Sequence, residues 1–245
     1  MPTSSIVQLV PTCLVNDLDP EVGFASARVL ARMGFHVEVP RGLTCCGQPA
    51  HNAGFADEAR AVARHTLAVL ADTTGPIVVP SGSCADMIVH QYPWLFEGDP
   101  DRRDRARAVA ERTVEFSQFL LQQPPGRATC GALDARVAYH SSCHLLRGLG
   151  VTNTPSLLSS TRGTTVVPLE DQEECCGFGG LFSIKNAEIS GRMLDRKLSA
   201  VAASGAERLV SCDLGCVLHL EGGARRRALS VRVQHLACFL DEALG

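Results

Sequence analysis

The side chains best suited to chemistry in this chain of 245 residues are its eleven cysteines, most of which follow a repeated pattern. Cys13 is followed 32 positions later by Cys45-Cys46-Gly47, and Cys143 is followed 32 positions later by Cys175-Cys176-Gly177. Each residue of the second set lies 130 positions after its counterpart in the first. Recurrence of the same irregular spacing indicates a duplicated unit built around sulfur.

A further cysteine extends each copy, because Cys84 has a counterpart 132 positions later in Cys216. Thiolates are soft ligands that suit zinc and iron–sulfur clusters. We therefore predict two sets of metal-binding and cofactor-binding residues, namely Cys13, Cys45, Cys46 and Cys84 in the first copy and Cys143, Cys175, Cys176 and Cys216 in the second.

The spacing favours an iron–sulfur cluster over zinc. Structural zinc sites usually take pairs of cysteines two to four residues apart, and the repeated cysteines do not form such paired knuckles. Two adjacent thiolates fit poorly around one ion, whereas they can reach different irons of one cluster. Zinc and a bare dithiol remain alternatives. Cysteines serving only as small buried apolar residues would not explain the repeat.

Local sequence also suits thiolate chemistry. Ser83 and Asp213 are predicted to cap helices that carry Cys84 and Cys216 in their first turns. The positive end of a helix dipole lowers a thiol pKa and stabilises a negatively charged cluster. The glycine after each cysteine pair would let the backbone approach sulfur closely.

Contact with the cluster stays open for five other residues, and no catalytic residue is assigned. His140 and His144 bracket Cys143 and could donate to sulfur, carry a proton, meet substrate or only support the fold. Cys212 could be a spare ligand. Cys130 and Cys238 have no partner in the repeat and are expected to be structural. The five open positions are Cys212, Met87, His219, His140 and His144.

Composition narrows the setting in which this site works. The chain is 45% hydrophobic with a formal net charge of −3. Its first residues lack signal-peptide features, and its apolar runs are shorter than the ~20 residues that span a bilayer. We expect a cytoplasmic protein without a membrane span. In the reducing cytosol, clustered cysteines bind metal or catalyse reactions more often than they form disulfides. The lack of a basic excess argues against a nucleic-acid partner.

Each repeated cysteine follows a predicted strand, which suggests how residues far apart in the sequence could come close together. Short β-branched runs alternate with amphipathic helical patterns, which is typical of parallel sheets whose carboxyl ends face one edge. We predict an α/β protein of two pseudo-equivalent duplicated halves, each a mostly parallel sheet flanked by helices with cysteines at the strand carboxyl ends. The predicted strands are 6–10, 36–39, 76–79, 136–139, 165–167 and 208–210, and the main helices are 21–33, 56–71 and 187–203.

The two copies set the expected domain boundaries. We expect a first CCG (cysteine-rich) domain over residues 1–123 and a second over 130–245, with Pro124-Pro125-Gly126-Arg127 as the linker. Residues 91–107, rich in proline, glycine and aspartate, are predicted to form an irregular insertion before a helix that runs through Val114 and Glu115 towards Leu120.

The doubled pattern resembles the CCG domain, which occurs twice in the cysteine-rich subunit of heterodisulfide reductase, in the iron–sulfur subunits of glycolate oxidase and anaerobic glycerol-3-phosphate dehydrogenase, and in lactate utilization protein A. A chain of this length with two such units and no ferredoxin-type Cys-x-x-Cys-x-x-Cys segment is most similar to the lactate utilization protein A family. Pro80 to Met87 and Asp213 to Cys216 resemble its third cysteine segments.

The resemblance implies a role as well as a cofactor. It implies one or two iron–sulfur clusters of the [4Fe–4S] type and electron transfer in the oxidation of L-lactate to pyruvate. Companion lactate-utilization proteins, an iron–sulfur subunit and a small subunit, would act with this chain, so catalysis by it alone is not implied.

One departure from the family pattern limits the chemistry. The fuller motif ends Cys-x-x-Cys, but Met87 and His219 stand at the last position here. Four cysteines per half still suffice for a four-thiolate cluster, so electron transfer is favoured over heterodisulfide chemistry. The alternatives are a heterodisulfide-reductase-like enzyme, another 2-hydroxy acid or glycerol-3-phosphate oxidoreductase subunit, and a non-catalytic sensor stabilised by its metal.

Overall fold

Two four-stranded parallel sheets with the same strand order organise the chain. The computed structural model describes residues 6–124 and 131–245. The sheet orders are β2-β1-β3-β4 and β6-β5-β7-β8, with every pairing parallel. The strands are β1 (Ile6–Leu9), β2 (His36–Glu38), β3 (Ile77–Val79), β4 (Thr113–Glu115), β5 (Ala132–His140), β6 (Arg162–Val166), β7 (Arg208–Ser211) and β8 (Arg232–His235).

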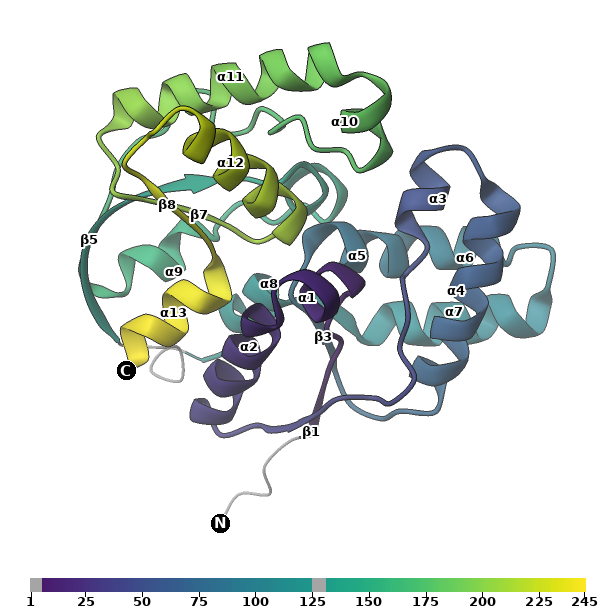
Figure 1. Ribbon diagram of the computed structural model, residues 1–245. Coiled ribbons are helices and arrows are strands. Elements are labelled where there is room, and N and C mark those ends of the chain that lie inside the picture. Colours follow the sequence, from purple (N-terminus) through teal and green to yellow (C-terminus); the bar gives the residue numbers. More distant parts are fainter. Residues whose placement is uncertain (1–5, 125–130) are drawn as a thin grey trace.

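Helices flank both sheets and follow the strands, as Figure 1 shows. The first half contains α1 (Cys13–Leu18), α2 (Pro20–Arg32), α3 (Gln48–Asn52), α4 (Ala56–Ala71), α5 (Gly82–Asp86), the π-helix η1 (Met87–Gln91), α6 (Tyr92–Leu95), α7 (Pro100–Arg112) and α8 (Phe116–Leu121). The second contains the π-helix η2 (His144–Gly148), α9 (Pro155–Ser159), α10 (Leu181–Lys185), α11 (Ala187–Ser204), α12 (Leu214–Arg226) and α13 (Leu236–Leu244). The predicted α/β class and the duplicated halves are confirmed.

The predicted irregular insertion is wrong, because most of residues 91–107 are helical. Pro93 lies in the first turn of α6, which continues directly from η1, and Pro100 begins α7, where the missing N–H costs no hydrogen bond. Asp99 caps α7 by accepting from the backbone N–H of Arg102 at 3.1 Å. The helix expected through Val114 towards Leu120 is wrong at its beginning, since residues Thr113–Glu115 form β4, which pairs with β3, but its later part is confirmed as α8.

One hydrophobic core is shared by both halves. Val7 and Leu9 of β1 belong to the same buried cluster as Val137 and Tyr139 of β5. The helices α2 and α13, which come from different halves, pack against each other, and Arg28 of α2 pairs with Asp241 of α13 at 2.6 Å. Separating the halves would expose this core to water. Across the described residues, every helix is too short or too polar to cross a bilayer.

Equivalent positions in the two halves cap equivalent helices with different side chains. Glu115 ends β4 and its Oε2 accepts from the N–H of Ser117 at 2.7 Å, while His235 ends β8 and its Nδ1 accepts from the N–H of Ala237 at 3.1 Å. Both side chains are buried. Burial raises the pKa of Glu115 to about 7, although hydrogen bonds from Ser117 and Gln118 oppose this, and burial lowers the pKa of His235 to about 4.

The raised pKa of Glu115 predicts a pH-dependent loss of stability. The ordinary value is 4.5 and the folded value about 7, so between them the folded protein holds a proton that the unfolded chain has released. The contribution of Glu115 to the free energy of unfolding should therefore fall as pH rises through this window, by up to about 3 kcal/mol, against the opposite contributions of the buried histidines His140 and His235. Urea unfolding from about pH 5 to about pH 8 measures it, and Glu115→Gln should remove this component.

The matched control is Glu221→Gln, since the Glu221 side chain is 43% exposed on α12. Its unfolding curve should follow the wild-type pH dependence. A Glu115→Gln variant that also kept that dependence would contradict the assignment to Glu115.

Candidate metal centre

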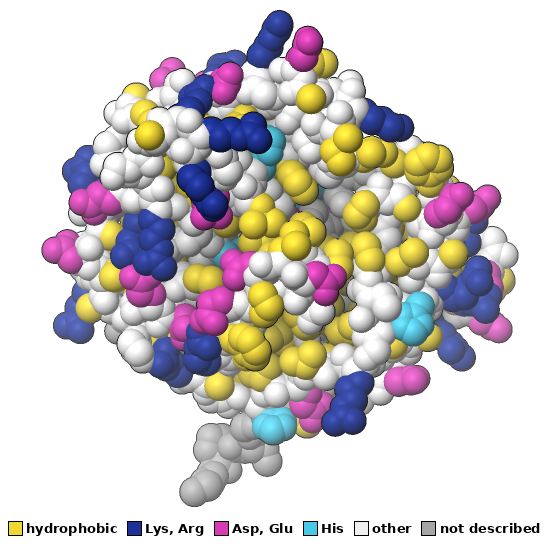
Figure 2. All heavy atoms as spheres, in the orientation of Figure 1, with side chains coloured by type: hydrophobic (Ala, Val, Ile, Leu, Met, Phe, Trp, Pro, Cys, Tyr) yellow, Lys and Arg dark blue, Asp and Glu magenta, His cyan; other side chains and the backbone are white. Residues whose placement is uncertain are grey.

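The eight repeated cysteines line one cavity between the two halves, with a volume of about 240 Å³. Cys13 begins α1, Cys84 lies in α5 and Cys216 lies in α12, each beyond the carboxyl end of a strand. Cys143 follows β5 in the same way, and the two vicinal pairs lie in loops before α3 and α10. Figure 2 shows a hollow on this face with apolar side chains gathered around it. Residues far apart in sequence thus converge as expected from parallel strands.

The sulfurs have the same arrangement in both halves. The Sγ atoms of Cys46 and Cys84 are 3.3 Å apart, and those of Cys176 and Cys216 are 3.2 Å apart. The Gly47 N–H donates to the sulfur of Cys45 at 3.4 Å, and the Gly177 N–H donates to that of Cys175 at 3.3 Å. Such N–H···S contacts stabilise negative charge on sulfur. The duplication therefore extends from the chain trace to the donor atoms.

Glycine after each cysteine pair is required by the backbone. Gly47 has φ of 90° and Gly177 has φ of 92°, in the left-handed region that side chains disfavour. A Cβ at Gly47 would lie 2.9 Å from the carbonyl oxygen of Ala59, and one at Gly177 would lie 2.7 Å from that of Ser190. The close approach expected at these glycines is confirmed.

Without a metal, the thiols of each set share their negative charge unequally. Hydrogen bonds from Cys13 and Cys46 lower the pKa of Cys45, and the Gly47 N–H lowers it further. The pKa values of Cys13 and Cys46 are raised, first by their hydrogen bonds to Cys45 and then by burial. The second set repeats this pattern, since hydrogen bonds from Cys143 and Cys176 lower the pKa of Cys175. Without a metal, only one thiol of each set therefore loses its proton easily. A bound metal centre would stabilise the other thiolates, because a thiol that coordinates a metal is deprotonated.

Asp213 joins the two cysteine helices across the boundary between the halves. Its Oδ1 accepts from the N–H of Gly215 at 3.2 Å, capping α12 as predicted. Its Oδ2 accepts from the N–H of Ser83 at 2.9 Å and from the hydroxyl of Ser81 at 3.2 Å. The cap predicted at Ser83 is wrong: Ser81 is the N-cap of α5 and accepts from the N–H of Cys84 at 3.4 Å. Ser83 instead lies inside the first turn.

A polar network beside the cavity was not predicted from the sequence. The carboxylate of Asp86 bonds to Nδ1 of His144 at 2.6 Å and to Nδ1 of His90 at 2.7 Å. Nε2 of His144 lies 3.3 Å from Nε2 of Gln48, and both residues line the cavity. The hydrogen bond to Asp86 raises the pKa of His144. Burial opposes ionisation of Asp86, but its two histidine partners lower its pKa.

Sequence carried only weak signals for this network. Asp86 and His90 have helical i, i+4 spacing, but the pairing with His144 depends on how the halves dock. Gly148 makes room, since a Cβ there would lie 2.5 Å from the Asp86 carboxyl carbon. His90 and His144 lie in the π-helices η1 and η2, a form often found at functional sites.

The other open positions are now placed. Cys212 directly follows β7 and is buried in the core shared by the two halves, with its sulfur 3.5 Å from the Tyr139 hydroxyl. Met87 is buried in the apolar core of the first half. His219 lies 3.4 Å from the hydroxyl of Ser190 and packs on Phe178. These three side chains, together with Cys238 in α13, do not line the cavity. Cys130 lies outside the described residues.

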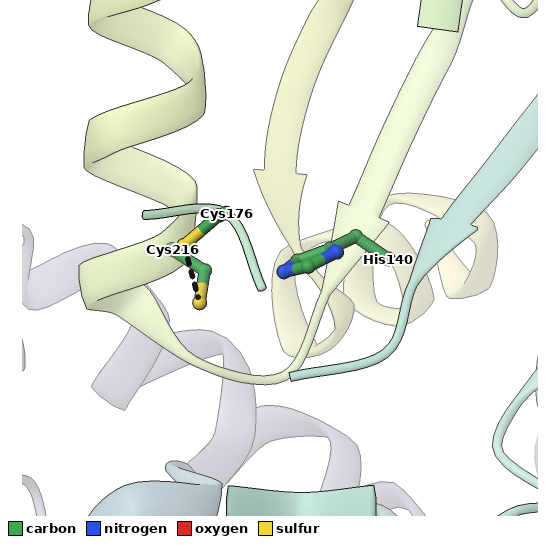
Figure 3. A group of neighbouring side chains, drawn as sticks. All are labelled: His140, Cys176 and Cys216. Carbon is green, nitrogen blue, oxygen red and sulfur yellow. Dashed lines mark hydrogen bonds between the residues drawn. The ribbon is translucent and has the colours of Figure 1, made fainter. Parts of the chain in front are cut away.

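His140 is the buried last residue of β5 and lies beside the second cysteine set. Its ring and the sulfurs of Cys176 and Cys216 form a group whose possible ligand atoms all lie within 4.8 Å of one another (Figure 3). Burial lowers the pKa of His140 to about 3. The imidazole is therefore neutral at neutral pH, which is the form that binds metals.

Comparison with known proteins agrees with this doubled sulfur site. The model of the cysteine-rich CCG domain matches residues 7–89 and 137–221, so the chain consists largely of two such domains. It belongs to the lactate utilization protein A family. It is 40% identical over 236 residues to lactate utilization protein A of Bacillus thuringiensis (strain Al Hakam), covering 96% of this chain and 98% of the relative.

A second relative and a solved structure extend the comparison. Lactate utilization protein A of Bacillus cereus (strain G9842) is 41% identical with the same coverage. The crystal structure of a hypothetical protein from Helicobacter pylori aligns with a TM-score of 0.69 at 12% identity. That alignment covers all of this chain but 51% of the other, and it supports the fold alone.

Asp213 accepts hydrogen bonds from both halves, so we predict that it stabilises the fold of both. Asp213→Ala would remove the carboxylate that accepts from the backbone N–H groups of Ser83 and Gly215 and from the hydroxyl of Ser81. We expect a loss of about 2–4 kcal/mol in the free energy of unfolding of the metal-free protein, measured by urea denaturation. Asp195→Ala is the control, because Asp195 is 62% exposed and pairs with Arg227 at the surface. Equal losses in the two variants would contradict the bridging role.

Proposed function

We propose that this chain is an iron–sulfur electron-transfer subunit of a multi-protein system that oxidises L-lactate to pyruvate. The observation that carries the proposal is the convergence of two four-cysteine sets on one cavity. The names of the relatives support the lactate pathway. Companion lactate-utilization proteins would supply the substrate chemistry and receive or deliver the electrons.

The donor set fits iron–sulfur chemistry. Each set offers four thiols, a vicinal pair among them, and a backbone N–H directed at one sulfur. Hydrogen bonds to sulfur are among the groups that tune cluster potentials. A [4Fe–4S] cluster would be held by the four cysteines of a set and would supply a one-electron carrier. Two such centres facing one cavity favour transfer between them.

Heterodisulfide chemistry is the weaker alternative. The family's fifth cysteine position is occupied by Met87, buried in an apolar core, and by His219, which contacts Ser190 and Phe178. Neither side chain lines the cavity. The arrangement therefore supports electron transfer in preference to binding of substrate sulfur at a specialised iron.

The first test is the identity of the metal. Protein purified without oxygen should be brown, absorb broadly near ~400 nm through thiolate-to-iron charge transfer, and contain iron with acid-labile sulfide. Stoichiometric zinc in a colourless anaerobic sample would contradict the proposal. A reversible redox couple supports electron transfer, whereas turnover of disulfides would favour the reductase.

The second test removes one thiolate from each pair. Cys46→Ser and Cys176→Ser nearly preserve side-chain volume but replace a thiolate by a poor iron ligand. Both should lose most of the iron of the affected set and abolish lactate-dependent electron flow in a system reconstituted with the companion proteins. Metal analysis and electron transfer to an artificial acceptor measure the two effects.

Cys238→Ser is the matched control, since Cys238 is a partly buried thiol outside the cavity. It should retain iron and activity. Full iron content in the Cys46 and Cys176 variants would show that these residues are not ligands. Loss of iron with undiminished lactate oxidation would show that the centre serves another purpose.

A further inference from the structure

The two metal sites differ at one buried position. His140 ends β5 and is fully buried beside the second cysteine set. The residue 130 positions earlier, at the corresponding end of β1, is Val10, which is buried in an apolar cluster with Cys46. The first set thus has a hydrocarbon side chain where the second has an imidazole.

The imidazole lies within coordinating reach of two sulfurs. A ring nitrogen of His140 and the Sγ atoms of Cys176 and Cys216 all lie within 4.8 Å of one another. Figure 3 shows the ring directed from the end of its strand towards the two cysteines, which come from the loop before α10 and from the first turn of α12. Three elements therefore hold three soft or intermediate donors around one point.

At least one ring nitrogen of His140 has no protein partner. Among the described residues, neither nitrogen meets normal hydrogen-bond geometry, and the Gln172 backbone lies close enough to act as a partner for one of them. An unsatisfied buried polar group costs about 1–3 kcal/mol. His235, which is also buried, differs in that its Nδ1 caps α13, although its Nε2 lacks a partner of normal geometry too. A ligand of the ring accounts for retaining such a group at position 140.

We propose that His140 is a fifth protein donor of the second site, binding iron through a ring nitrogen, so that the two centres of the chain are chemically different. This inference rests on the iron–sulfur centre of the proposed function. The first site would have thiolate ligands alone. Because ligand identity is one of the properties that set cluster potentials, the two centres would have different reduction potentials.

Pulsed electron paramagnetic resonance tests the iron–nitrogen bond directly. The probe is the reduced full-length protein carrying Cys45→Ser and Cys46→Ser, so that the signal comes from the second site, prepared with and without ¹⁵N-histidine. We expect a strong nitrogen coupling that changes with the isotope. It should disappear in His140→Leu and persist in His219→Gln, a histidine of the same half with a hydroxyl neighbour.

Two further variants separate ligation from a structural role. Leucine has a similar volume, so the metal-free His140→Leu protein should be at least as stable as its parent in urea. His140→Cys should retain iron but shift the second potential downwards, because a thiolate replaces nitrogen. If His140→Leu did not fold, ligation by His140 would still be tested by the ¹⁵N effect in the parent protein and by the potential of His140→Cys.

The outcomes distinguish this inference from the function on which it rests. Wild-type protein without iron would overturn both. Normal iron and sulfide without histidine nitrogen coupling would overturn the ligation of His140 alone. Loss of stability in metal-free His140→Leu, together with an unchanged spectrum of the centre, would assign the residue a structural role.

Discussion

The structure depends on one carboxylate that lies between two helix N-termini. Asp213 accepts hydrogen bonds from the first turn of its own helix α12 and from the first turn of α5 in the other half. Positive ends of two helix dipoles face this one buried negative charge. Cys84 and Cys216 lie in those first turns. The contact that docks the halves therefore also sets the separation of the two sulfur sets.

The duplicated units share one hydrophobic core. The inner faces of β1 and β5 and the helices α2 and α13 belong to one apolar cluster. Burial of such surface contributes roughly 25 cal/mol per Å², whereas the surface ion pair between Arg28 and Asp241 adds little. The cavity lies at this boundary, so the walls of the site come from both halves. The boundary between the halves therefore carries both the shared core and the cysteine-lined cavity.

Sequence reasoning predicted the parts of this molecule that depend on local patterns. The strand runs, the long helices over 56–71 and 187–203, and the doubled cysteine spacing each carry a periodic or repeated signal. It did not predict that Pro100 begins α7 or that Pro93 lies in the first turn of α6, because proline in such a stretch indicates a break in regular structure. The network of Asp86, His90 and His144 depends on docking of the two halves, and the position of His140 beside Cys176 and Cys216 depends on packing within the second half; the sequence expresses neither locally.

The halves differ where symmetry would be unfavourable. Ser81 and Asp213 are equivalent residues that meet at the pseudo-symmetric boundary. Two aspartates there would place like charges in contact and raise the pKa of one of them, while two serines would leave the second helix N-terminus without a charged acceptor. One hydroxyl donor and one carboxylate acceptor satisfy both helices. Where the two copies of a duplicated protein face each other, hydrogen bonding across the boundary therefore favours different residues at equivalent positions. Val10 and His140, which are equivalent positions beside the two sulfur sets, differ as well.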